Sequence, residues 1–135
     1  MAKNSSSVNV EVVEDAERIA ALVEESQTKL VIIDVHATWC GPCEALKPTL
    51  NKIALDYTQS KERITFASCA IDKFGSQLQE TLPSETNLSL EKNGCLPIML
   101  VYRFGSCIGT LVGVDGPALQ GLVEINIPQA VSAAE

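Results

Sequence analysis

Cys40 and Cys43 stand three positions apart, with Gly41 and Pro42 between them, and together they form a pair suited to thiol chemistry. They follow an apolar, β-branched run over residues 30–36, which is typical of a central strand buried on both faces. Where such a strand joins a helix, unpaired backbone N–H groups and the helix dipole favour a thiolate at Cys40 over a thiol. Cys43 then lies one turn further along the same helix face, so a disulfide between the two sulfurs closes with little strain.

This arrangement predicts dithiol–disulfide exchange. Cys40 attacks the disulfide of a partner and forms a mixed disulfide, and Cys43 then attacks Cys40 and releases the reduced partner. The alternatives are a zinc site and inert packing. Structural zinc usually needs two such pairs, whereas the other three of the five cysteines stand singly and only His36 is available to help. We therefore expect a reversible Cys40–Cys43 disulfide, with no metal and no organic cofactor.

A single carboxylate, Asp34, interrupts the apolar run before the cysteines. In a strand covered on both faces we expect it to be buried. Burial without a cation raises the pKa of a carboxyl group, because it disfavours the charged form. Such a group can take a proton from Cys43 during exchange. The alternative is a carboxylate that turns out to solvent at the end of the strand.

Short apolar runs and helical stripes alternate along the chain and predict a single α/β domain with a mixed central β-sheet flanked by helices. One helical stripe consists of Ala16, Ile19, Leu22 and Val23. Asp115 is placed to cap the last helix, with Pro117 in its first turn. Strands are expected over residues 8–13, 30–36, 63–72, 97–103 and 107–114. Helices are expected over residues 14–27, 46–57, 74–82 and 116–125, and residues 83–94 are expected to be mostly loop.

Bulk composition limits the classes of partner. The chain has 135 residues, and its 10 basic against 17 acidic side chains give a formal net charge of −7. Such a surface offers no basic patch for nucleic acid or for an anionic membrane. The sequence begins with no apolar segment typical of a secretory signal and contains no membrane-length apolar run. We therefore expect a cytoplasmic, reducing compartment, in which five cysteines are not a disulfide framework.

The segment WCGPC, with Asp34 before it, Pro48 after it and a late Cys95-Leu96-Pro97 before a hairpin, resembles the thioredoxin family. The resemblance covers a domain of residues 8–127, flanked by flexible tails over residues 1–7 and 128–135. It implies a thioredoxin-like fold. It also implies partners of two kinds, namely protein disulfide substrates and a donor like thioredoxin reductase.

The resemblance also implies roles for individual residues. Cys40 becomes the attacking thiol, Cys43 the resolving thiol and Asp34 the assisting base, which together are the catalytic residues. Pro97 becomes a cis-proline that faces the disulfide and presents backbone to a substrate. The implied substrate-binding residues are Trp39, Gly41, Pro42, Leu96 and Pro97.

Four features depart from the family pattern or extend it. His36 occupies a position where thioredoxins usually carry an aromatic residue, and we expect it to fill that position without a catalytic task. Ser68 stands where a lysine commonly pairs with the buried aspartate, which makes Asp34 harder to ionise. Glu44 stands where many relatives have a basic residue. Cys95 is expected near the rim of the site as a regulatory or dimer-forming thiol, whereas Cys69 and Cys107 are expected to be buried and inert.

A finer resemblance lies in the segments FASCAID (66–72), CLPIMLVYRFG (95–105) and GVDGPALQ (113–120). They are similar to the thioredoxin-like light chains of flagellar outer-arm dynein and to thioredoxin domains fused to nucleoside diphosphate kinase domains. This resemblance implies a redox-sensing subunit of the ciliary axoneme, docked on a dynein heavy chain or intermediate chain. The alternatives are a free cytosolic thioredoxin that reduces many proteins, and a structural subunit whose CxxC motif is vestigial.

Overall fold

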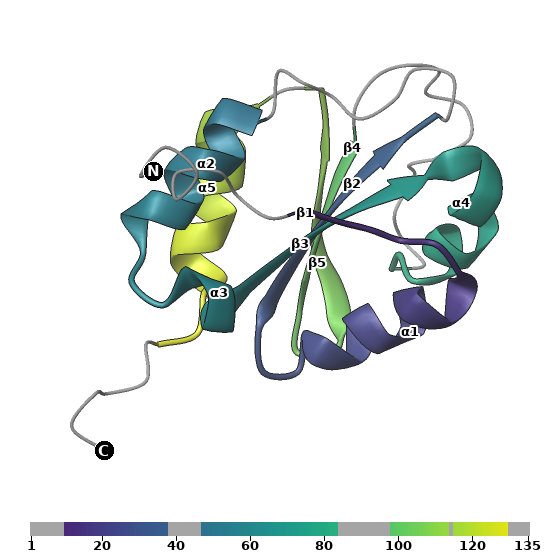
Figure 1. Ribbon diagram of the computed structural model, residues 1–135, viewed down its shortest axis with the longest axis horizontal. Coiled ribbons are helices and arrows are strands. Elements are labelled where there is room, and N and C mark those ends of the chain that lie inside the picture. Colours follow the sequence, from purple (N-terminus) through teal and green to yellow (C-terminus); the bar gives the residue numbers. More distant parts are fainter. Residues whose placement is uncertain (1–9, 38–46, 84–97, 114, 130–135) are drawn as a thin grey trace, which may run out of the picture.

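The computed structural model describes residues 10–37, 47–83, 98–113 and 115–129, and a five-stranded sheet lies at its centre (Figure 1). The strand order is β1-β3-β2-β4-β5. β1 and β2 run parallel to β3, whereas β4 runs antiparallel to both β2 and β5. The mixed sheet predicted from the sequence is therefore confirmed. The strands are β1 (Val10–Val12), β2 (Leu30–His36), β3 (Ile64–Ala70), β4 (Ile98–Arg103) and β5 (Ser106–Val112).

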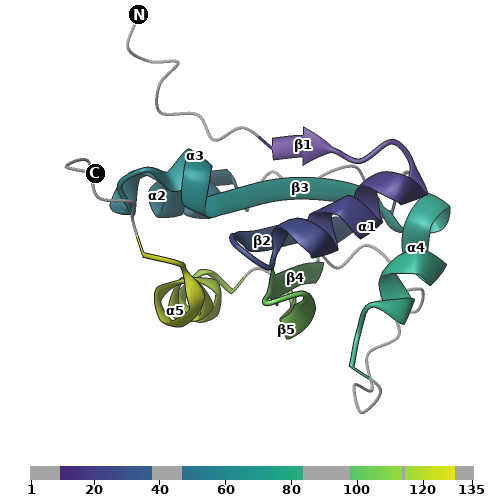
Figure 2. The ribbon, with the colours of Figure 1, turned by 90° about the horizontal axis from the view of Figure 1, so that it is seen from below.

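Helices cover both faces of this sheet (Figures 1 and 2). α1 and α4 pack on one face and contribute Ile19, Leu22 and Leu78 to its core. α2 and α5 pack on the other and contribute Leu50, Ile53, Leu119 and Val123. The helices are α1 (Ala16–Glu25), α2 (Lys47–Asp56), α3 (Ser60–Arg63), α4 (Ile71–Glu80) and α5 (Gly116–Asn126). None of these helices is both long enough and apolar enough to cross a membrane.

The central position of β2 explains its composition. Because side chains alternate between faces, Val31, Ile33 and Val35 enter the core under α1 and α4, whereas Leu30 and Ile32 enter the core under α2 and α5. A strand with two buried faces needs an unbroken apolar run, and β2 has the bounds predicted from that run. The same alternation puts Asp34 and His36 on the α2/α5 face, at the carboxyl end of the strand.

Three features of the helices differ from what the sequence predicted. α4 begins at Ile71, although the sequence predicted strand as far as Asp72. Ile71 instead continues the apolar stripe of Phe74 and Leu78 and packs against the same core. The four-residue helix α3 was not predicted, because Ser60–Arg63 has no buried residue and therefore no apolar periodicity. Within α1, Ala16 is exposed, although it was expected on the buried stripe.

The predicted hairpin of β4 and β5 is confirmed, and a two-residue turn joins its strands. Phe104 and Gly105 form that turn, with φ angles of 61° and 81°. Positive φ at both positions matches the twist of the hairpin and favours glycine, and a Cβ on Gly105 would lie 2.5 Å from Nε2 of Gln27. Next to the turn, the buried guanidinium of Arg103 donates to the carbonyl oxygens of residues 26, 27 and 126.

The start of α5 is also as predicted. The side chain of Asp115 accepts a hydrogen bond of 3.1 Å from the backbone N–H of Ala118, and Pro117 lies in the first turn. Leu119 follows on the buried face of the helix. Gly113 precedes the helix with a φ of 86°. The segment around residues 113–120 therefore serves to end β5 and to begin α5.

Candidate active site

The predicted site residues fall into two groups. Asp34, His36, Ser68, Cys69 and Cys107 are described by the structure. The others lie outside the described residues, and they are Trp39, Cys40, Gly41, Pro42, Cys43, Glu44, Cys95, Leu96 and Pro97. In the sequence, the dithiol segment follows the carboxyl end of β2 and precedes α2.

Asp34 is buried, as the sequence predicted. Its side chain is 6% exposed, and its Oδ1 atom is inaccessible to solvent. Its partners in register are Ser68 on β3 and Met99 on β4. The carboxyl group of Asp34 is therefore buried near the carboxyl end of β2, and the residues beside it on the neighbouring strands, Ser68 and Met99, are both neutral.

Ser68 lies directly beside Asp34 in the parallel register of β2 and β3. It is 2% exposed, and its Oγ is 3.2 Å from Nδ1 of His36. The imidazole of His36 is only partly buried. Sequence reasoning did not link Ser68 with His36. The signal that could have found the pair is the parallel register of β2 and β3, which sets Asp34 beside Ser68 and His36 beside Ala70.

Polarity changes sharply along this face of the two strands. Leu30 pairs with Ile64, and Ile32 pairs with Phe66, so the first rows are apolar. The next rows contain Asp34, Ser68 and His36. Polar groups thus gather at the carboxyl ends of parallel strands, which is where open α/β sheets place their reactive sites.

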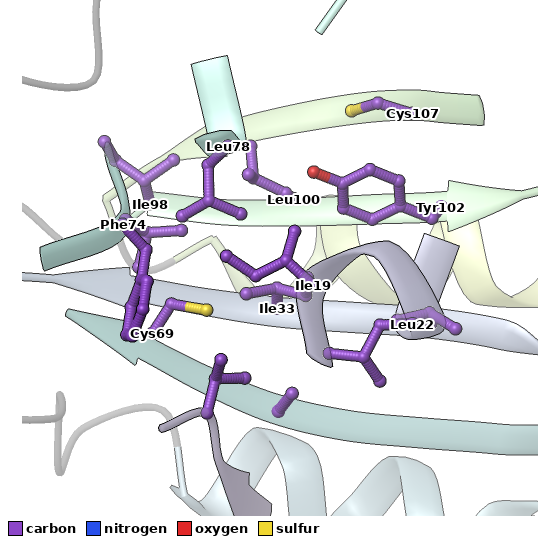
Figure 3. Close-up of a cluster of buried hydrophobic side chains, with 14 of the residues drawn as sticks. Ile19, Leu22, Ile33, Cys69, Phe74, Leu78, Ile98, Leu100, Tyr102 and Cys107 are labelled. Carbon is purple, nitrogen blue, oxygen red and sulfur yellow. The ribbon is translucent and has the colours of Figure 1, made fainter. Parts of the chain in front are cut away.

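Cys69 follows Ser68 in the sequence, so its side chain lies on the opposite face of the sheet. It is buried in the core under α1 and α4, near Phe74 (Figure 3). Burial raises the pKa of its thiol to about 12, and the charges of Asp34 and Glu11 add to this shift. Burial also raises the pKa of the Cys107 thiol, which donates to the carbonyl oxygen of Gly109. Since the thiolate is the nucleophile, both cysteines are suited to packing and not to exchange.

Metal binding has no visible basis in the described ranges. Among residues 10–37, 47–83, 98–113 and 115–129, no group of three or more histidine, cysteine, aspartate or glutamate side chains is placed to hold an ion. A buried carboxyl group near a buried hydroxyl and a partly buried imidazole is an arrangement that can accept and release a proton.

Comparisons with curated proteins identify relatives along most of the chain. A family model described as thioredoxin matches residues 9–116. Thioredoxin 1 of Plasmodium falciparum is 32% identical over 99 residues, which cover 73% of this chain and 82% of that protein. Thioredoxin-1 of Saccharomyces cerevisiae is 28% identical over 101 residues, which cover 75% of this chain and 84% of the yeast protein.

Solved structures give the same picture. A structure of Plasmodium falciparum thioredoxin superposes with a TM-score of 0.57 at 28% identity, covering 86% of this chain and 98% of that one. A crystal structure of thioredoxin from Nicotiana alata has a TM-score of 0.62 at 22% identity, covering 87% and 92%, and at that identity it supports the fold alone. The chain therefore belongs to the thioredoxin family and is a thioredoxin-type redox protein.

Proposed function

We propose that this protein performs reversible dithiol–disulfide exchange through Cys40 and Cys43, with Asp34 as the proton acceptor for the resolving step. The observation that carries the proposal is the buried carboxyl group of Asp34, 6% exposed, at the end of the central strand that leads into the CGPC segment. Burial disfavours the charged form of a carboxyl group and so makes it a better proton acceptor once it is ionised. Asp34 precedes, by six positions, the only segment of the sequence that contains two closely spaced thiols.

The exchange has two steps. The thiolate of Cys40 attacks a disulfide of the partner, so that a mixed disulfide forms and one partner sulfur leaves as a thiolate. Cys43 then attacks the Cys40 sulfur, the mixed disulfide breaks, and the second partner sulfur leaves. As Cys43 attacks, its thiol proton passes to the carboxylate of Asp34. The product is a Cys40–Cys43 disulfide and a reduced partner, and a dithiol donor like thioredoxin reductase returns the pair to its reduced state.

Protein disulfides are the proposed substrates. The groove that receives them would consist of Trp39, Gly41, Pro42, Leu96 and Pro97, with Cys95 at its rim as a regulatory thiol. The described core supports this division of roles, because it buries Cys69 and Cys107 at 0% and 5% exposure and so keeps both out of exchange.

An insulin reduction assay with dithiothreitol tests the activity. We expect the parent chain to accelerate disulfide reduction and Cys40→Ser to lose the acceleration, because serine is no nucleophile toward a disulfide at neutral pH. Cys107→Ala is the matched control. It removes a buried thiol outside the motif, and it should retain the parent rate. A parent chain no faster than Cys40→Ser would contradict the proposal and leave a vestigial motif.

For the physiological setting we propose an axonemal outer-arm dynein, in which the protein is a redox-active light chain bound to a heavy chain or intermediate chain. The support is the resemblance of segments 66–72, 95–105 and 113–120. The described parts of these segments form the end of β3 with the start of α4, β4 with the turn that follows it, and the start of α5. The setting implies that the protein is found in the cytoplasm and in the ciliary or flagellar axoneme.

Trapping with Cys43→Ser distinguishes this setting from a free cytosolic thioredoxin. The variant cannot resolve the mixed disulfide, so each partner remains attached to Cys40. A dynein subunit is expected to retain one large stoichiometric partner after reductant is added, because docking does not depend on the disulfide. A broad set of partners that all dissociate with reductant would contradict the axonemal role and favour a general reductase.

A further inference from the structure

The polar cluster at the carboxyl ends of β2 and β3 contains more than the proposed exchange requires. Asp34 and Ser68 are 6% and 2% exposed, whereas His36 is only partly buried. The three side chains share one face of the sheet. Adjacent strands are about 4.8 Å apart, and alternate residues of one strand are about 6.6 Å apart. Of the three side chains, His36 is the one that reaches solvent.

The chemistry of the pair suits proton transfer. Ser68 Oγ and His36 Nδ1 are 3.2 Å apart, and either atom can be the donor, depending on the tautomer of the imidazole. A hydroxyl both donates and accepts, and an imidazole can take a proton on one nitrogen while it releases one from the other. A lysine at position 68 would offer donors only.

Among the described residues, the neighbouring thiol and carboxyl groups do not offer a competing route. Cys69 projects to the opposite face of β3, and because burial raises the pKa of this thiol to about 12 it remains protonated at neutral pH. Asp72 lies in the first turn of α4, beyond the carboxyl end of β3. Glu11 on β1 is engaged by Arg18, whose side-chain hydrogen bonds lower the pKa of that carboxyl group.

We propose that Ser68 and His36 form the path by which Asp34 exchanges protons with solvent, so that His36 is a positioning and relay residue of the resolving step. The inference rests on the proposed exchange function. When Cys43 attacks Cys40, the proton of Cys43 passes to Asp34 and the partner sulfur leaves as a thiolate. Asp34 then returns to its carboxylate as the proton passes through the Ser68 hydroxyl and the His36 imidazole to water. No oxidant beyond the partner disulfide is involved.

A two-phase reaction with the aromatic disulfide DTNB isolates this step. With less than one equivalent of DTNB, Cys40 releases one coloured thiolate as it forms the mixed disulfide, and Cys43 releases the second as it resolves it. We expect His36→Phe and Ser68→Ala each to slow the second phase about tenfold below neutral pH, less than the roughly 10²–10⁴-fold supplied by a base in direct contact. In alkaline buffer the slowing should disappear, because hydroxide then takes the proton.

Three comparisons separate a relay from a packing role. The first phase should keep its rate in both variants, and the double variant should be no slower than His36→Phe, because both side chains serve one path. Imidazole in the buffer should restore the second phase of His36→Ala, which a packing role does not predict. Thr65→Val is the matched control. It removes a β3 hydroxyl that contacts Glu25, away from the cluster, and should leave both phases unchanged.

The outcomes distinguish the two proposals. A second phase that is present in the parent chain, and equally fast in His36→Phe and Ser68→Ala at every pH, would overturn the relay alone. Slowing that does not depend on pH, and that imidazole does not restore, would also overturn it. A parent chain without a second phase would instead contradict dithiol exchange itself.

Discussion

Replacing Asp34 by asparagine is expected to slow the resolving step about 100-fold at neutral pH, the low end of what a positioned base contributes. Asparagine has nearly the size of aspartate and fills the same buried position between Ser68 and Met99, but it cannot take a proton from Cys43. The first attack by Cys40 should keep its rate within a few-fold. Measuring the two DTNB phases across pH reports both steps in one experiment.

The slowing of the resolving step by Asp34→Asn should depend on pH. Asp34→Asn should be most impaired where Cys43 is still protonated while Asp34 of the parent chain is ionised and can accept its proton. The difference should shrink at lower pH, where Asp34 is itself protonated, and again at high pH, where hydroxide takes the proton. Asp15→Asn is the matched control, because asparagine caps α1 as well as aspartate does, and Asp15 accepts from Arg18 at the start of that helix. Equal second-phase rates for Asp34→Asn and the parent chain at all pH values would exclude Asp34 as the acceptor.

Replacing Arg103 by methionine is expected to lower the free energy of unfolding by about 3 kcal/mol, which corresponds to roughly 10 °C in Tm for a domain of this size. Arg103 is 8% exposed and donates to three carbonyl oxygens, those of Ser26, Gln27 and Asn126, at 3.2, 3.0 and 3.0 Å. Its guanidinium also lies 4.1 Å from the centre of the Phe104 ring. Methionine fills much of the volume, but it removes one donor from each of the three carbonyl groups, of which that of Ser26 still accepts from the backbone N–H of Phe104.

Urea unfolding of three variants checks the cause. Arg103→Lys should lose an intermediate amount, because an ammonium group lacks the planar fork that reaches several acceptors at once. Lys52→Met is the matched control. It removes an exposed cation paired with Asp56 on the same helix, and such a pair contributes about 0.5 kcal/mol or less. If Arg103→Met cost no more than Lys52→Met, the side chain would not join the ends of α1 and α5 to the hairpin.

Local signals account for what the sequence predicted well. The bounds of β2 follow from an apolar run that only a strand with two buried faces requires. The cap of α5 follows from Asp115 and Pro117, whose preferences are set by backbone hydrogen bonding and a fixed φ. The burial of Asp34 followed from its place within such a strand. Each of these inferences needs only the residues of one element.

Contacts between distant elements account for what was missed. Arg103 and Ser26 are separated by 77 positions, and no local sequence pattern near either residue predicts their contact. Ser68 and His36 meet only because β2 and β3 pair in one parallel register. The start of α4 was placed too late because Ile71 is a good strand former, and its place in a helix depends on the core it joins.

Because Cys69 and Cys107 are buried, the reactivity of their thiols reports how often the surrounding core opens. Both thiols are enclosed by the layer beneath α1 and α4, one beside Phe74 and one across from Tyr102 (Figure 3). A reagent such as iodoacetamide can reach them only while that layer is open. The rate at which they are labelled in native buffer therefore measures the frequency of opening of this layer, and it does so in either oxidation state of Cys40 and Cys43.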